Sequence, residues 1–174
     1  MSHVIAAAAL PVSLWANKAG RKADIAAGEG WLVGFAWLDQ DAPFSDYAGS
    51  DRTIMLLEGT GFELALPAGR VLAVRERFAP AAFDGAGPIG CHLLGGACRV
   101  LNAISSWPGL SHTMQVMTGA QLAAVQPGPR VFVVVLRGQI GAAGPLDTVR
   151  LTAPITAADD TLAAVIRIEQ ELDR

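Results

Sequence analysis

The sequence predicts an all-β fold composed of two similar halves, each a small barrel or sandwich. Nineteen glycines and ten prolines divide the chain into short apolar runs rich in Val, Ile, Leu and aromatic residues, which is typical of many short strands. A weak internal repeat indicates the two halves, because residues 54–59 and 133–138 each contain four apolar residues, a charged residue and a glycine. A chance match between two glycine-rich β segments is the alternative to duplication.

The expected strands follow one another along most of the chain. In order, they cover residues 4–8, 31–38, 52–58, 61–66, 71–74, 91–94, 98–103, 112–117, 130–136, 139–142 and 146–151. Large and small side chains alternate within 31–38, which predicts that Trp31, Val33, Phe35 and Trp37 share one face of a sheet. Glycines separate two apolar runs in both 56–64 and 91–99, and each segment is predicted to be a hairpin.

Helices are expected in only two places, residues 119–125 and residues 161–172. The second stretch follows Asp159 and Asp160, which form an N-cap signal, and its apolar residues recur at helical spacing. The same run of apolar residues would also continue a strand, which is the alternative to the preferred helix.

Composition excludes several classes of function. Hydrophobic residues make up 52% of the chain and charged residues 17%, which excludes intrinsic disorder. The 13 Lys and Arg are scattered among 16 Asp and Glu, so no nucleic-acid partner is expected. The apolar runs are far shorter than the roughly 20 residues that a helix needs to cross a bilayer, so no membrane span is expected.

The cysteines and the first residues bear on the compartment. Cys91 and Cys98 are too few for a disulfide framework, which favours reduced thiols in the cytoplasm. The apolar run at residues 6–14 is interpreted as part of a first strand, because its only early basic group is His3 and Pro11 interrupts it. A secretory signal is the alternative.

The sequence contains no pattern typical of a metal, cofactor or nucleophile site. The three histidines have no ligand spacing, and a site shared with the cysteines is disfavoured because the adjacent Cys91 and His92 would point to opposite faces of a strand. A nucleophile elbow and a dinucleotide fingerprint are both absent from the sequence. We therefore assign no catalytic residue, no metal and no cofactor, and an enzyme is the less favoured interpretation.

Two segments carry groups suited to a small carboxylate. Residues 15–22 place Trp15, Asn17 and three cations in an irregular segment, although a solvated basic loop is favoured on this chemistry alone. Arg52 begins an apolar strand directly after a loop, where its guanidinium could enter a cavity and bind an anion at two points. An ion pair with Asp51 or Asp46 is an equally supported alternative.

Together these segments resemble the HutD/Ves family over residues 15–109. The most specific part is P-F-S-x-aromatic-x-G-x-D-R at residues 43–52, followed by L-L-x-G-x-G at 56–61, and residues 83–85 and 101–104 continue the match. The residues carried over one by one are Trp15, Asn17 and Gly20 in a W-K-N-G-G-G segment, Ser45 and Arg52 in the loop block, and Asn102 in a D-F-N segment.

The resemblance implies a cupin-type fold in which residues 1–174 form a single bicupin unit. Its N-terminal half would cover about residues 1–110 and its C-terminal half about 111–174. The N-terminal strand could be shared between the two halves. It also implies an accessory or regulatory role in histidine utilisation and a ligand such as urocanate or formylglutamate. Charges usual in the family are missing at Ala16, Ala23, Val100, Ser106 and Trp107, which points to a changed ligand, with Lys18, Arg21 or Lys22 as candidates for a displaced cation.

The resulting hypothesis is a metal-free cupin that binds a small anionic metabolite. Arg52 would be the main carboxylate contact, Trp15, Asn17 and Ser45 would shape the rim, and Asn102 is included from the family match. One alternative is a metal-free isomerase, epimerase or lyase that uses acid or base groups among Asp46, Asp51, His92 and His112. Another is a degenerate cupin that acts as a protein-interaction scaffold, and association into a homodimer is left open.

Overall fold

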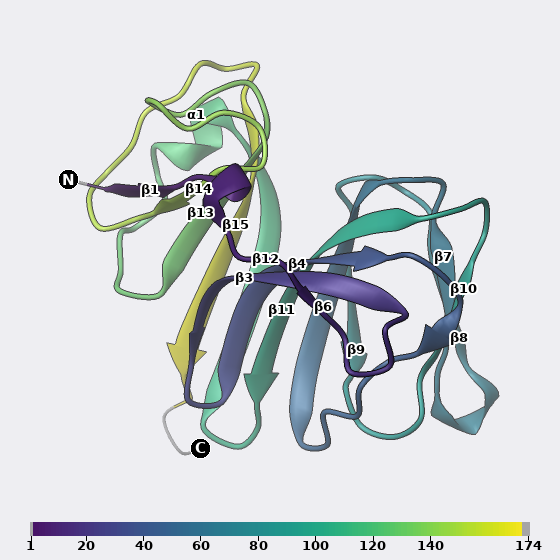
Figure 1. Ribbon diagram of the computed structural model, residues 1–174. Coiled ribbons are helices and arrows are strands. Elements are labelled where there is room, and N and C mark those ends of the chain that lie inside the picture. Colours follow the sequence, from purple (N-terminus) through teal and green to yellow (C-terminus); the bar gives the residue numbers. More distant parts are fainter. Residues whose placement is uncertain (1, 172–174) are drawn as a thin grey trace.

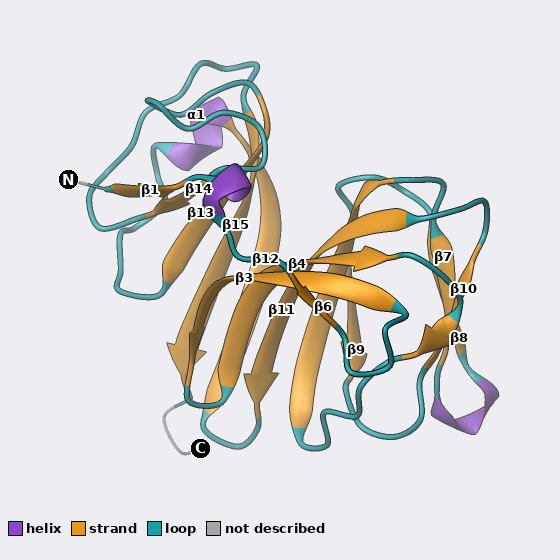
Figure 2. Cartoon of the chain, viewed as in Figure 1, coloured by secondary structure: helices purple, strands orange, loops and turns teal. Residues whose placement is uncertain are grey.

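Almost all regular structure in the computed structural model, which describes residues 2–171, is β-strand (Figures 1 and 2). The six-stranded sheet has the order β2 (Ser13–Leu14), β3 (Gly20–Gly28), β4 (Trp31–Leu38), β11 (Cys98–Ser106), β6 (Ser50–Glu58) and β9 (Pro80–Asp84). The four-stranded sheet has the order β5 (Ala42–Pro43), β10 (Gly90–Leu93), β7 (Phe62–Ala65) and β8 (Val71–Val74). The five-stranded sheet has the order β1 (His3–Ile5), β14 (Thr148–Arg150), β13 (Val131–Arg137), β15 (Leu162–Gln170) and β12 (Leu110–Thr118). The all-β prediction is confirmed.

Helical structure in this part of the chain is short. It comprises the 3₁₀ turns Ala7–Ala9 and Pro67–Gly69 and the helix α1 (Gly119–Leu122), which confirms a helix within residues 119–125 but shortens it. No helix within residues 2–171 combines the length and the apolar character needed to cross a membrane.

The six-stranded sheet lies between the other two sheets and has a hydrophobic core on each face (Figure 1). The first core, toward the five-stranded sheet, includes Phe35, Met55, Phe132 and Ile166. The second core, toward the four-stranded sheet, includes Ala36, Ile54, Phe62 and Leu64. A third core covers the outer face of the five-stranded sheet and includes Leu122, Val133, Val149 and Ala163.

Strand β4 shows how the sequence produces these layers. Successive side chains on a strand point to opposite faces, and both faces of this strand are covered, so the strand is apolar throughout. Trp31, Val33, Phe35 and Trp37 all contact the first core, which confirms their predicted common face.

The internal repeat corresponds to equivalent strands. The order β4-β11-β6-β9 in one sheet matches β12-β15-β13-β14 in the other. The register shifts at the same point of both: Arg99 pairs with Glu58 and Val100 with Leu56, while Arg137 pairs with Leu162 and Val135 with Ala163. One residue of β6 and one of β13 are therefore skipped at the same position of the repeat.

Both hairpin predictions are wrong. β6 and β7 belong to different sheets, as do β10 and β11, so each glycine connection carries the chain from one sheet to the other. Gly59 and Gly61 have φ of 105°, and a Cβ atom on Gly59 would lie 2.8 Å from the Ala97 carbonyl oxygen. A Cβ atom on Gly95 would lie 2.5 Å from Thr60 Oγ1. The glycines are needed where the two connections pack closely together, and not for hairpin turns.

The preferred helix at residues 161–172 is also wrong, because Leu162–Gln170 form β15 and residue 172 lies outside the described residues. Ala164 and Ile166 contact the first core whereas Ala163 and Val165 contact the third, so burial of both faces mimicked helical spacing. The strand expected at residues 139–142 is reduced to an isolated bridge between Ile140 and Ala143. Strands β2, β3, β5 and β9 were not predicted.

Candidate functional site

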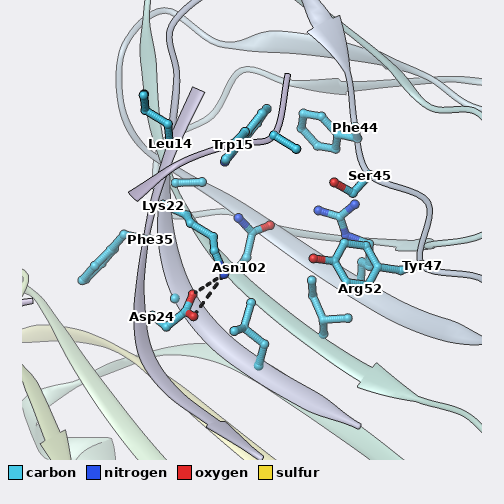
Figure 3. Close-up of a pocket in the computed structure, with 15 residues that line it drawn as sticks. Leu14, Trp15, Lys22, Asp24, Phe35, Phe44, Ser45, Tyr47, Arg52 and Asn102 are labelled. Carbon is cyan, nitrogen blue, oxygen red and sulfur yellow. Dashed lines mark hydrogen bonds and ion pairs between the residues drawn. The ribbon is translucent and has the colours of Figure 1, made fainter. Parts of the chain in front are cut away.

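A cavity of about 180 Å³ lies on the second-core face of the six-stranded sheet. Strands β3, β4, β6 and β11 form its floor, and the residues after β2 together with residues 44–47 form its walls. Figure 3 shows Arg52 with Phe44, Ser45 and Tyr47 on one side of the cavity, Lys22 and Asp24 on the other, and Asn102 between them.

Arg52 is the most unusual residue of the cavity. Its side chain is buried, with 6% of the residue exposed, and its Nε and Nη1 atoms have no hydrogen-bond partner. The rings of Phe44, Tyr47 and Phe83 surround it, each with its centroid 5.1 Å from the guanidinium carbon. Burial lowers the pKa of Arg52 to about 10, so the group stays protonated at pH 7 as a buried, uncompensated cation.

The backbone around Arg52 makes room for its side chain. Met55 of β6 contacts the first core and Ile54 the second, so the alternation along the strand places Arg52 on the cavity side. A Cβ atom on Gly85 would lie 3.0 Å from Cδ of Arg52, so this position has to lack a side chain. The Gly85 carbonyl also accepts a hydrogen bond from the Tyr47 amide at 2.9 Å, which holds the backbone of the residue whose ring lies against Arg52.

The alternative in which Arg52 pairs with Asp51 or Asp46 is wrong. Among residues 2–171, Arg52 has no carboxylate oxygen within 4.0 Å. Asp46 instead accepts a hydrogen bond from the Gly87 amide, and Asp51 is next to Arg52 on a strand, where adjacent side chains point to opposite faces.

The remaining proposed ligand residues divide into two groups. Trp15, Ser45 and Asn102 line the same cavity as Arg52, and the buried Oδ1 of Asn102 has no hydrogen-bond partner. Asn17 does not line it: its Nδ2 donates to the Pro43 carbonyl and its Oδ1 accepts from the Ala19 amide. Asn17 therefore holds two wall segments together.

Two charged residues of the lining come from β3. Lys22 donates to both carboxylate oxygens of Asp24 at 3.2 and 3.1 Å, and both side chains are partly exposed at the cavity (Figure 3). Of the three candidate cations, only Lys22 lines the cavity, since Arg21 pairs with Asp39 and Lys18 is exposed in the turn. The sequence analysis missed Asp24 because β3 begins with several polar residues and was not recognised as a strand. The alternation of polar Lys22 and Asp24 with apolar Ala23 could have indicated it.

None of the four suggested acid or base groups lines the cavity. The Leu93 amide donates a hydrogen bond to the Asp41 carboxylate at the surface, and His92 Nδ1 also bonds this carboxylate; both contacts lower the pKa of Asp41. His112 bonds Ser105 at 2.7 Å and Thr53 at 2.9 Å, and burial lowers the pKa of His112. In the part of the chain that the structure describes, no three His, Cys, Asp or Glu residues come together in a way that could hold a metal ion.

Sequence comparisons relate the chain to known proteins. The model of the HutD family matches residues 7–169. A Pseudomonas putida protein described as an uncharacterized 21.2 kDa protein in the hutC 3′ region is 37% identical over 79 residues. This match covers 44% of the chain and only 40% of that relative.

Solved structures show a similar fold. A conserved protein of unknown function from Pseudomonas aeruginosa PAO1 matches with a TM-score of 0.82 at 21% identity, and HutD from Pseudomonas fluorescens SBW25 matches with 0.81 at 21%. Each match covers 99% of this chain and 100% of the other. A cupin 2 conserved barrel domain protein from Leptotrichia buccalis matches with 0.65 at 10% identity, covering 97% and 96%. The fold is therefore cupin-like, as expected.

Proposed function

Because the chain belongs to the HutD family, we propose that it is a cupin that binds a small anionic metabolite in the cavity at Arg52 and has an accessory or regulatory role in histidine utilisation. We further propose that the two equivalent sheets belong to two cupin halves of a bicupin. The shared strand order and the shared bulge support this division. The name of the Pseudomonas putida relative, which refers to the hutC region, supports the metabolic link.

The buried guanidinium of Arg52 carries the proposal. Its guanidinium lines the cavity and has no hydrogen-bond partner at Nε or Nη1, and a charge-assisted hydrogen bond from an arginine to a carboxylate contributes about 1.5–3 kcal/mol. Binding would also neutralise a charge that the folded protein otherwise holds out of water. The described lining contains neither His nor Cys and a single carboxylate, so the donor set suits an organic anion better than a transition metal.

The size of the cavity limits the ligand. A cavity of about 150 Å³ is known to hold benzene, so about 180 Å³ fits a compact molecule such as urocanate or the carboxylate end of formylglutamate. With its carboxylate at Arg52, such a ligand would direct its other polar end toward Lys22 and Asp24, across the cavity (Figure 3). That ion pair offers both a donor and an acceptor, so a neutral or zwitterionic end is favoured over a second bare charge.

The test is calorimetric and thermal-shift titration with urocanate, formylglutamate, histidine, acetate and a neutral sugar. The two named carboxylates should bind and raise the melting temperature of wild-type protein, because a ligand of the native state stabilises it. Binding should be lost in Arg52→Met and kept in Arg70→Met, which removes an exposed arginine outside the cavity. Binding that survives in Arg52→Met, or no response to any carboxylate, would contradict the proposal.

A further inference from the structure

A second cavity, of about 250 Å³, lies on the third-core face of the five-stranded sheet. Strands β12 and β15 form its floor, and α1 with the residues that follow it forms one wall. In Figure 1, α1 lies in the lobe opposite to β7, β8 and β10. The cavity beside α1 and the cavity at Arg52 have no lining residue in common.

Strand register shows that the two cavities occupy equivalent positions. Counting from the shared bulge, the pair Leu32 and Ile104 of the first cavity corresponds to the pair Thr113 and Arg167 of the second. By the same count, Gly34 and Asn102 correspond to Gln115 and Val165, and Ala36 corresponds to Met117. All of these floor residues line their respective cavities.

The chemistry of the two floors differs in the position of the cation. Val131, which is buried, occupies the position equivalent to Arg52, whereas Arg167 occupies the position equivalent to Ile104. Arg167 Nη2 donates a hydrogen bond to the Gln126 carbonyl at 3.1 Å. Within residues 2–171, no carboxylate oxygen lies within 4.0 Å of the Arg167 guanidinium. Glu169, two residues along β15 and on the same face, is the acidic neighbour and does not form an ion pair with it.

A glutamine adds a second donor. Gln121 Oε1 accepts hydrogen bonds from the amide and the hydroxyl of Thr118, so its amide group is fixed and Nε2 remains free to donate. Met117, Val125 and Val165 supply an apolar base beside these polar groups.

We propose that this second cavity binds a small carboxylate with an apolar body, held by Arg167 and Gln121. The site is independent of Arg52 and of the function proposed for that cavity. Because Arg167 is only half-buried and partly engaged by Gln126, the second site should be the weaker of the two.

The experiment uses the ¹⁵N-labelled full chain carrying Arg52→Met, so that the first site is removed. Sodium butyrate is titrated at constant ionic strength, and 1-butanol and sodium chloride are titrated separately. Butyrate should cause saturable shifts of the Arg167 Nε–Hε and Gln121 side-chain amide signals. Linear shifts, or equal shifts with butanol or chloride, would overturn the proposal.

Two variants in the same background test the contacts. Arg167→Gln should weaken butyrate binding about tenfold or more, whereas Arg150→Gln, which removes an arginine bonded to the Pro129 carbonyl, should not. Gln121→Glu retains a side-chain acceptor for Thr118 and adds a negative charge to the cavity, so it should abolish binding without loss of fold. Undiminished binding in Arg167→Gln or in Gln121→Glu would refute the site.

Discussion

Replacement of Arg52 by Met should stabilise the fold and abolish carboxylate binding at the same time. Burial lowers the pKa of Arg52 to about 10, and one pKa unit corresponds to about 1.4 kcal/mol, so burial costs the charged side chain about 3 kcal/mol. The rings of Phe44, Tyr47 and Phe83 offset part of this cost, and a Met sulfur keeps part of those contacts. The free energy of unfolding should therefore rise by about 1–2 kcal/mol, or about 2–8 °C in Tm.

Urea denaturation measures the stability, and calorimetry with urocanate and formylglutamate measures the binding. Arg70→Met is the matched control, and it should leave both quantities unchanged because that residue is exposed and does not line the cavity. Loss of the contacts to a bound carboxylate should weaken affinity about 100-fold or more. If Arg52→Met instead lost about 1 kcal/mol or more and still bound carboxylates, the guanidinium would be a structural anchor for three aromatic rings, and the reasoning would fail.

Three further predictions concern the cavity walls and the buried histidine. A Cβ atom in Gly20→Ala would lie 2.5 Å from the Trp37 carbonyl oxygen and 3.0 Å from the Trp15 ring, so stability should fall by about 1–3 kcal/mol and calorimetry should show weaker carboxylate binding. Gly85→Ala should likewise push the Arg52 side chain and weaken binding, whereas the roomier Gly90→Ala should not; equal affinities of the two variants would contradict this. Burial lowers the pKa of His112, so the unfolded chain binds more protons than the folded protein just below pH 6.5. The free energy of unfolding should therefore fall as the pH is lowered through that range. Urea denaturation at pH about 7 to 5 should show a shallower fall for His112→Gln than for the wild-type protein. A slope unchanged by the substitution would assign the pH dependence to other groups.

The fold class could be predicted from the sequence because short apolar runs and turn residues report strands directly. The pairing of the strands could not be predicted in the same way. The glycines at residues 56–64 and 91–99 resemble hairpin signals, but they lie where two connections between sheets pack closely together. β15 was mistaken for a helix for a related reason: a strand buried on both faces is apolar at every position, and its periodicity then carries no information.

Part of the site could be predicted and part could not. Arg52 was identifiable because a charged side chain at the start of an apolar strand is expected either to enter a cavity or to form an ion pair. The family match added Ser45 and Asn102. Asp24 and Gly85 were not identifiable from local chemistry, because Asp24 enters the cavity only through the register of β3 and Gly85 matters only through the space it leaves for Arg52. Asn17 matched the family motif but supports the wall instead of lining the cavity.

The two equivalent sheets show why a cupin-like fold by itself does not identify a ligand. They share strand order and a bulge, and yet the position held by Arg52 in one is held by Val131 in the other. Asn102, buried with an unpaired oxygen, corresponds to the apolar Val165, and Gly34 corresponds to Gln115. Since the floor strands are equivalent in both, the two cavities differ through the side chains at these register positions and through their walls, which come from residues 14–16 and 44–47 in one and from residues 121–126 in the other. The same argument applies between proteins. Solved structures at 10–21% identity share the fold of this chain, whereas its ligand depends on which residues face each cavity.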